Sequence, residues 1–401
     1  MHPNVPHLRF PEFHGEWEKH GLSEYLDFKN GLNPDSKRFG KGIKFISVMD
    51  ILNNPVITYD CIRASVQATD AEISSFSVEN GDILFQRSSE TLEDVGRANV
   101  YIDDKVAVFG GFVIRGKKKA NYNPLFFRYL LSSPYARKRI IPMGAGAQHF
   151  NIGQEGLSKV LLNFPSIEEQ TKIASLLHLL DERIATQSKL IEDLKKLKSA
   201  IIENVFDDKH SERLQLDNVG SYIRGLTYSS NNVVEHGGTL VMRSNNIVNG
   251  SLLDYNNNVV FVNKQMSAEQ QLQNGDIVIC MANGSSSLVG KSSFYDGNCH
   301  SPITVGTFCG IYRSKEPIVK WLFQTNKYRR YIWNSLQGGN GAIANLNGED
   351  ILNMSFSIPN APIKDTCVKM LTSVDSALEN NMSLCALYTL QKQHLLRQMF
   401  I

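Results

Sequence analysis

The stretch Pro165 to Phe206, PSIEEQTKIASLLHLLDERIATQSKLIEDLKKLKSAIIENVF, decides how this chain folds. After its first residue it contains neither Gly nor Pro, and apolar residues recur along it at spacings of four and three. Eight of the ten residues on this seam are apolar, and the two exceptions are Gln187 and Lys198. This heptad pattern is typical of a helix that packs along one other helix. At about 1.5 Å per residue the helix would be a rod of about 60 Å, which is longer than an ordinary core helix.

The C-terminal part of the chain repeats this seam at an offset of 194 positions. The polar exceptions recur at the same places, because Asn381 corresponds to Gln187 and Lys392 corresponds to Lys198. A chance helix would not reproduce its exceptions, so we predict two copies of one unit, each ending in a long helix. If the two helices pair antiparallel with their midpoints aligned, Gln187 should face Asn381, and a buried amide pair would set the register. The residues predicted to pair the helices are Leu180, Ile184, Gln187, Ile191, Val374, Leu378, Asn381 and Cys385.

The start of the first helix is marked more clearly than the start of the second. Ser166 and Glu169 form the S-x-x-E pattern of a capping box. The second copy opens with Pro359-Asn360-Ala361-Pro362 and has no Glu-Glu-Gln. Asn360 can still cap a helix and Pro362 is tolerated in a first turn, so a helix is still predicted there.

The parts before the two helices also repeat each other. Gly31-Leu32 recurs as Gly225-Leu226, and an Asn-Gly-Asp-Ile turn occurs at both 80–83 and 274–277. The loops between these features differ almost completely, since RSSETLEDVGR at 87–97 corresponds to MANGSSSLVGK at 281–291. Short strand-like runs bounded by Gly and Asn predict an α+β fold with two similar mixed α/β heads. The predicted boundaries are a first head at 1–164, a helix at 165–209, a second head at 210–359 and a helix at 360–401.

Composition excludes several classes of protein. The 401 residues are 42% hydrophobic and 20% charged, which is ordinary for a globular protein, and no run approaches the roughly 18 apolar residues of a membrane span. The N-terminal sequence does not resemble a signal peptide, and the six cysteines include no CxxC pair, so a reduced, cytoplasmic protein is expected. The net charge of +2 neither requires nor excludes nucleic acid, and any basic surface must therefore be local.

The most tempting catalytic motif is the loop from Gly284 to Ser292, GSSSLVGKS. A P-loop needs four residues between its glycines and a helix after its lysine, whereas here five residues intervene and a polar SSFYDGN follows. A P-loop nucleotide-binding enzyme is therefore an alternative, weighed against a polar loop that contacts DNA or solvent. The ten histidines show no metal-binding spacing and no nucleophile motif occurs, so we predict neither a catalytic site nor a metal site.

Basic and amide side chains are spread over both heads. Arg and Lys supply contacts to phosphates, while Arg, Asn and Gln can recognise base edges with two hydrogen bonds. Each such residue taken alone could equally be a solvated surface side chain, but the set favours nucleic-acid binding. The predicted DNA-binding residues are Arg87, Ser88, Lys117, Lys118, Lys119, Gln148, His149, Arg224, Arg243, Asn245, Asn283, Ser285, Lys291 and His300.

Several stretches resemble the specificity (S) subunits of type I restriction-modification enzymes. They include the opening LRFPEF at 8–13 with Trp17, the two Asn-Gly-Asp-Ile turns, and the Gly-rich approaches GAGAQHFNI at 144–152 and GGNGAIANL at 338–346. The most specific is PSIEEQTKIASLLHLLDERI at 165–184. The resemblance extends over the whole chain and implies two target-recognition domains separated by an antiparallel pair of helices.

The resemblance also implies a function and partners. Each head would read one half of an asymmetric bipartite sequence in double-stranded DNA, and the chain itself would not be an enzyme. Methyltransferase subunits, expected to be two, and restriction subunits that translocate DNA would dock on the helices. S-adenosylmethionine, ATP and magnesium would be bound by those subunits and no cofactor by this chain. The alternative is a nucleic-acid-binding adaptor that works without a methyltransferase.

Overall fold

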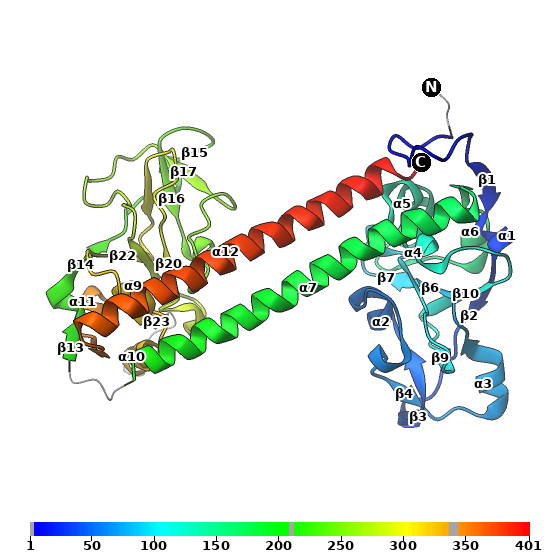
Figure 1. Ribbon diagram of the computed structural model, residues 1–401, viewed down its shortest axis with the longest axis horizontal. Coiled ribbons are helices and arrows are strands. Elements are labelled where there is room, and N and C mark those ends of the chain that lie inside the picture. The colour runs from blue at the N-terminus through cyan, green and yellow to red at the C-terminus, as the bar shows by residue number, and fades with distance from the viewer. Residues whose placement is uncertain (1–3, 208–211, 337–343) are drawn as a thin grey trace. The chain divides into compact units, whose positions relative to one another are not determined.

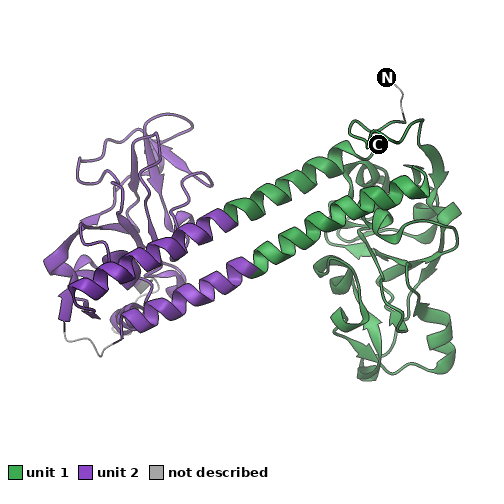
Figure 2. Ribbon diagram, in the orientation of Figure 1, with its two compact units in different colours: residues 1–189, 382–401 green, residues 190–381 purple. Residues whose placement is uncertain are grey.

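A computed structural model describes residues 4–207, 212–336 and 344–401 of the chain. The described chain forms two compact units, coloured separately in Figure 2. Unit 1 comprises Met1–Lys189 and Met382–Ile401, and unit 2 comprises Leu190–Asn381. Each unit is a mixed α/β head together with part of two long helices, and the predicted fold class is confirmed.

The two long helices are α7, Ile167–Val205, and α12, Ala361–Gln398. Within each unit the two helices run antiparallel, as Figure 1 shows. Both sequences favour helix because their interiors lack Gly and Pro beyond the first turn, where Pro362 needs no hydrogen-bonded N–H. The helix predicted on the less regular opening of the second copy is therefore present, and the amide of Lys364 bonds back to the Asn360 carbonyl at 2.8 Å.

The predicted capping box of α7 is only half formed. The amide of Glu169 does bond to Ser166 Oγ at 3.3 Å. The Glu169 carboxylate, however, accepts two hydrogen bonds, of 2.8 and 2.7 Å, from the guanidinium of Arg9. Because this carboxylate is almost fully buried, the charged Arg9 in the N-terminal segment satisfies it better than a single amide would. The start of α7 is thus tied to the N-terminal segment of the same unit.

The head of unit 1 contains two four-stranded sheets, with strand orders β2-β10-β6-β8 and β4-β3-β9-β5. The strands of the first sheet are β2 (Leu26–Asn30), β10 (Val113–Lys118), β6 (Ile83–Gln86) and β8 (Ala98–Val100). Those of the second are β4 (Ser65–Val66), β3 (Phe39–Ile46), β9 (Ala107–Phe109) and β5 (Ser77–Val78). Two short ribbons complete the head, formed by β1 (Glu18–Gly21) with β12 (Leu161–Phe164) and by β7 (Ser88–Ser89) with β11 (Phe150–Asn151).

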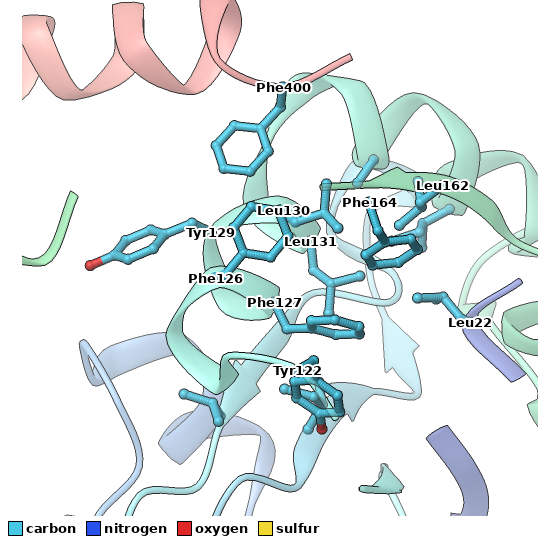
Figure 3. Close-up of a cluster of buried hydrophobic side chains, with 14 of the residues drawn as sticks. Leu22, Tyr122, Phe126, Phe127, Tyr129, Leu130, Leu131, Leu162, Phe164 and Phe400 are labelled. Carbon is cyan, nitrogen blue, oxygen red and sulfur yellow. The ribbon is translucent and has the colours of Figure 1, made fainter. Parts of the chain in front are cut away.

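Six short helices accompany these sheets: α1 (Leu22–Tyr25), α2 (Val48–Asn53), α3 (Asp70–Phe76), α4 (Pro124–Ser132), α5 (Pro134–Ile140) and α6 (Gln154–Ser158). The core of the head is built around aromatic side chains of α4, and Figure 3 shows Phe126, Phe127 and Phe164 in it. The rings of Phe126 and Phe400 have their centroids 5.6 Å apart. The residues beyond α12 therefore close the core of unit 1.

Unit 2 repeats the first sheet with the order β14-β22-β18-β20, but its second sheet has the order β15-β17-β16-β21, in which β21 is an edge strand where its equivalent β9 is internal. The first sheet consists of β14 (Gly220–Arg224), β22 (Cys309–Ser314), β18 (Ile277–Cys280) and β20 (Ser292–Phe294). The second consists of β15 (Val233–Val234), β17 (Val260–Val262), β16 (Thr239–Met242) and β21 (Ile303–Val305). The ribbons are β13 (Glu212–Gln215) with β24 (Ser355–Ile358) and β19 (Ala282–Asn283) with β23 (Ala344–Asn345). The helices are α8 (Leu216–Val219), α9 (Val319–Leu322), α10 (Asn326–Leu336) and α11 (Gly348–Leu352).

Candidate nucleic-acid interface

Each head has one edge at which several strands of its first sheet stop together, and we call this edge the sheet tip. In unit 1, β10 is antiparallel to both neighbours, so the register pairs Ile114 with Asn30 and Val113 with Gln86. The tip of unit 1 therefore comprises residues 30–32, 86–89 and 110–112. In unit 2 the corresponding pairs are Gly310 with Arg224 and Cys309 with Cys280. Its tip comprises residues 224–226, 280–283 and 306–308.

The backbone of the two tips is the same, and it explains the repeated Gly-Leu dipeptides. The amide of Leu32 bonds to the Phe109 carbonyl at 2.9 Å, and the amide of Leu226 bonds to the Val305 carbonyl at 2.8 Å. A Cβ added to Gly31 would lie 2.1 Å from the Gly110 carbonyl oxygen, and one added to Gly225 would lie 2.2 Å from that of Gly306. Only glycine allows this close approach of two backbone segments. The two sheets of each head are joined at this point.

The tip of unit 1 gathers four of the predicted DNA-binding residues. Arg87 lies next to the turn at 110–112, and its Nη1 donates to the Gly111 carbonyl at 3.2 Å. Ser88 is in β7, and its hydroxyl bonds to the Asn151 side chain of β11 at 2.5 Å. The ribbon of β7 and β11 brings Gln148 and His149, both exposed, beside the tip although about 60 residues separate them from Ser88. Cationic, hydroxyl and amide groups thus meet at one edge.

The tip of unit 2 gathers five predicted residues in the corresponding place. Arg224 is exposed at the end of β14, and Asn283 lies in β19. The Asn283 side chain donates to Ser244 Oγ at 3.3 Å and accepts from the Ser285 amide at 3.0 Å. Ser244 begins a 3₁₀ turn, and its neighbours Arg243 and Asn245 are exposed on both sides of it. Donors and acceptors suited to phosphates and base edges are therefore clustered at this edge.

The structure places the lysine triplet away from the tip of unit 1. Lys117, Lys118 and Lys119 lie at or beyond the opposite end of β10. Lys117 forms an ion pair with Glu79 at 2.7 Å, and Lys118 Nζ donates to the Tyr122 carbonyl at 3.1 Å. Strand β10 has its N-terminal end at the tip, so a run that follows β10 must lie at the far edge.

Two further predicted residues of unit 2 lie outside the segments that form the tip. The Lys291 carbonyl accepts from the amide of Cys280 at 3.0 Å, so Lys291 lies beside the tip, and it lines a pocket with Ser286, Ser287, Arg329 and Trp333. His300 is exposed and precedes β21, whose other end leads to the turn at 306–308.

The P-loop alternative is wrong. Ser286–Leu288 forms a 3₁₀ turn, and Lys291 is followed directly by strand β20. A strand offers no helix N-terminus to a phosphate group. Among the residues that the structure describes, no cluster of His, Cys, Asp or Glu could hold a metal ion. Within the same described ranges, no helix is long and apolar enough to cross a membrane.

The two lysines that interrupt the helix seam belong to two ion-pair clusters, one in each unit. In unit 1, Lys392 of α12 pairs with Asp181 of α7, which also binds Arg128 at 3.2 Å and Tyr129 Oη at 2.7 Å. In unit 2, Lys198 of α7 pairs with Asp375 of α12 at 2.7 Å. Asp375 is 194 residues after Asp181 and Lys392 is 194 residues after Lys198, so the clusters are equivalent.

The Asp375 carboxylate also binds residues of α9. Lys320 Nζ lies 2.8 Å from it, and the indole of Trp321 donates to it at 3.1 Å. Burial lowers the pKa of Lys198, against the opposing influence of Asp375. Burial also opposes ionisation of Asp181, but Lys392, Tyr129 and Arg128 outweigh it and hold the pKa of that carboxyl below its usual value. Each cluster joins both helices of its unit to the head.

The residues predicted to pair the helices lie within these units. Leu180 packs in the same cluster as Leu395, and Ser188 Oγ lies 3.6 Å from the Sγ of Cys385. Ile184 and Cys385 belong to unit 1, whereas Ile191, Val374 and Leu378 belong to unit 2. Gln187 is in unit 1 and Asn381 in unit 2, so their pairing stays a prediction.

Sequence reasoning overlooked two residues at the tips. Phe112 and Phe308 occupy equivalent turns, and both rings are exposed. The signal was present in the repeat, because Gly110-Gly111-Phe112 and Gly306-Thr307-Phe308 each separate two corresponding strands. An apolar residue between two apolar strands has the same pattern as a strand end, and periodicity alone does not distinguish a turn from a strand end.

Comparison with known proteins shows which family part of this chain resembles. Residues 14–196 match the family model described as the type I restriction modification DNA specificity domain. The chain is 35% identical over 155 residues to the type I restriction enzyme EcoKI specificity subunit of Escherichia coli (strain K12). It is 34% identical over 153 residues to the StySPI specificity subunit of Salmonella potsdam. Each match covers 36% of this chain and 31% of the relative, so the chain matches about a third of the length of these two relatives.

Solved structures extend the likeness of the fold to the whole chain. The S subunit of a type I restriction-modification system from M. genitalium aligns with a TM-score of 0.62 at 15% identity, covering 99% of both chains. A chain from a structure of type I R-M complex assembly and conformational transition aligns with a TM-score of 0.52 at 12% identity, covering 95% of this chain and 96% of that one. Residues 14–196 are therefore similar to the DNA specificity domain of type I restriction-modification systems, and the whole chain has a fold like that of an S subunit of such a system.

Proposed function

We propose that this chain is the non-catalytic DNA-recognition subunit of a type I restriction-modification complex and that each head reads one half of an asymmetric bipartite target. The observation that supports this most directly is the pair of sheet tips. Their backbones are equivalent, but Arg87 and Ser88 in unit 1 stand where Met281 and Ala282 stand in unit 2. One scaffold that carries two sets of side chains suits two different half-sites.

The proposed mechanism divides the contacts at each tip into two kinds. Arg87 in unit 1 and Arg224 in unit 2 supply positive charge for backbone phosphates, which fix position but carry no sequence information. Amides such as Gln148 and Asn283 offer a donor and an acceptor together, which is the pattern needed to read an adenine edge in the major groove. The base pairs between the half-sites would not be read.

We further propose that methyltransferase subunits, two of them, and restriction subunits dock on this chain through α7 and α12. S-adenosylmethionine, ATP and magnesium would then be bound by those partners. The relatives named above support this assignment, because they are specificity subunits of type I restriction enzymes. In this proposal residues 1–164 and 210–359 act as target-recognition domains, and residues 165–209 and 360–401 act as the spacer between them.

The test begins by mapping methylated adenines in DNA from cells that contain the intact complex. Residues 210–360 are then replaced by the corresponding head of another specificity subunit, and the mapping is repeated. We expect one half of the target to change and the other half to stay. Alteration of both halves would contradict the two-head proposal. If no methyltransferase co-purifies with the chain, the alternative of a stand-alone nucleic-acid-binding adaptor is favoured instead.

A further inference from the structure

The most exposed aromatic side chains of the two tips occupy equivalent positions. Phe112 is 68% exposed and Phe308 is 64% exposed, although the strand residues on either side of each turn are buried. Single exposed apolar residues are common on protein surfaces and need no explanation by themselves. Here the same large ring is exposed twice, on two heads whose loops otherwise differ, so chance is a poor explanation.

Backbone hydrogen bonds fix both of the turns that carry these rings. In unit 1 the amide of Val113 bonds to the Gly110 carbonyl at 2.8 Å, and the amide of Arg87 bonds to the Phe112 carbonyl at 2.9 Å. In unit 2 the amide of Cys309 bonds to the Gly306 carbonyl at 2.9 Å, and the Phe308 carbonyl accepts from Met281 at 2.8 Å. A residue on a fixed turn has little backbone freedom left to lose when it binds, which favours a role in recognition.

The neighbours of each ring indicate what it contacts. The Phe112 turn is bonded to Arg87, which precedes Ser88, and the Phe308 turn is bonded to the strand segment that leads into Asn283. Polar groups with cationic side chains are complementary to a polyanion, whereas an apolar partner protein would be matched by a wider apolar surface. An isolated ring amid such groups suits the apolar part of a DNA base, such as the thymine methyl group or an exposed base face.

We infer that Phe112 and Phe308 are base-contacting residues, each making the apolar contact of its head with its own half-site in double-stranded DNA. This inference rests on the proposed function and adds to it a pair of residues that determine specificity. The polar residues of each tip would hold the phosphates and base edges while the ring packs on a base between them. Because the two rings belong to different heads, each should act on one half-site alone.

The experiment uses the chain assembled with its methyltransferase subunits and four duplexes of equal length. One duplex carries the mapped target, two carry one scrambled half each, and one is unrelated. For Phe112→Ala we expect Kd for the intact target to rise about 5- to 100-fold, the range of a lost base contact. For the duplex in which the half-site read by unit 1 is scrambled, Phe112→Ala and wild type should have the same Kd. Phe308→Ala should give the mirror result, so each variant is the control for the other.

Salt dependence separates a base contact from a phosphate contact. The slope of log Kd against log salt should stay unchanged in Phe112→Ala, whereas Arg87→Ala should lower it by about 1. Phe112→Leu, which keeps an apolar side chain but not the flat ring, should lie between wild type and Phe112→Ala. Val106→Ala, which removes an exposed apolar side chain at the other end of β9, is the matched inert control.

Three outcomes would overturn the inference. An unchanged Kd for the intact target in both Phe→Ala variants would show that the rings touch nothing important. Equal weakening on the target and on the unrelated duplex would show that the contact carries no sequence information. Loss of co-purifying methyltransferase would assign the rings to a subunit interface. The proposed function fails by a different result, namely a wild-type complex that does not distinguish its target from the unrelated duplex.

Discussion

The two ion-pair clusters on the helices contain equivalent lysine and aspartate residues, but they differ in how far these side chains are buried. In unit 2 the side chains of Lys198 and Asp375 are 9% and 6% exposed. In unit 1 their equivalents Lys392 and Asp181 are 21% and 18% exposed. A buried charge that loses its partner costs more than a partly solvated one, because water cannot take the place of the missing group. The repeat therefore preserves the pairing of charges, while the packing of the surrounding head sets the free-energy cost of losing one partner.

The largest expected effect comes from Asp375→Ala. It leaves Lys198 buried without its carboxylate partner, although the Gly250 carbonyl still accepts from its Nζ at 2.9 Å, and it also removes the acceptor of Trp321. We expect unit 2 to lose about 3–5 kcal/mol of unfolding free energy. Urea unfolding followed by tryptophan fluorescence measures this. Asp365→Ala, which removes an exposed carboxylate from the same helix, should change the value by less than about 0.5 kcal/mol.

The same substitution in unit 1 should be milder. Asp181→Ala leaves Lys392 and Arg128 with partial access to water, so we expect a loss of about 1–3 kcal/mol. The measurement is the urea unfolding of unit 1 under the same conditions. A loss equal to or larger than that of Asp375→Ala would contradict the expectation that the more deeply buried cluster contributes more to stability.

The unit 1 cluster should also respond to acid. The folded-state pKa of Asp181 lies below its ordinary value of 3.8, so its ionised form stabilises the fold above that pH. This stabilisation is lost as the pH falls through the folded-state pKa. The difference in unfolding free energy between wild type and Asp181→Asn should therefore be complete at pH 6 to 7 and should shrink below about pH 4. A difference that is constant across this range would mean that packing, and not charge, accounts for it.

Substitution of the equivalent tip glycine should destabilise both units by a similar amount. Gly31→Ala and Gly225→Ala each place a methyl group against a backbone carbonyl, so we expect each to cost about 1–3 kcal/mol. Thermal unfolding of the two variants measures this. Gly284→Ala is the control, because an added Cβ there meets nothing within 4 Å. Unequal losses would show that one tip can relax where the other cannot.

The smallest effect concerns the predicted pairing of Gln187 with Asn381. Replacing Gln187 and Asn381 together by Leu should stabilise the helix pair by less than about 1 kcal/mol and loosen its register. Register is measured by adding Ser188→Cys, which places a second thiol near Cys385, and by recording the yield of the disulfide. If the yield is the same with and without the Leu pair, the two amides do not set the register.

Much of the fold was predictable, because its sequence signals are either local or recur at a constant offset along the chain. The seam of α7 requires only its own heptads, and the offset of 194 then identifies α12 even though Pro362 lies in its first turn. The candidate site was only partly predictable. Arg87 and Ser88 lie at the tip of unit 1, and Gln148 and His149 lie beside them. The four residues are brought together by the pairing of β7 with β11, which no local sequence pattern predicts.

The two copies of a unit and the two long helices can be inferred from the sequence alone, because periodicity and internal repetition are properties of the chain order. The tertiary structure decided why Lys198 and Lys392 interrupt the seam, since their carboxylate partners lie far away in sequence on the other helix. It also decided which polar residues share an edge with Phe112 and Phe308. Strand order settles that question, and strand order depends on contacts between distant residues that no short stretch of sequence contains.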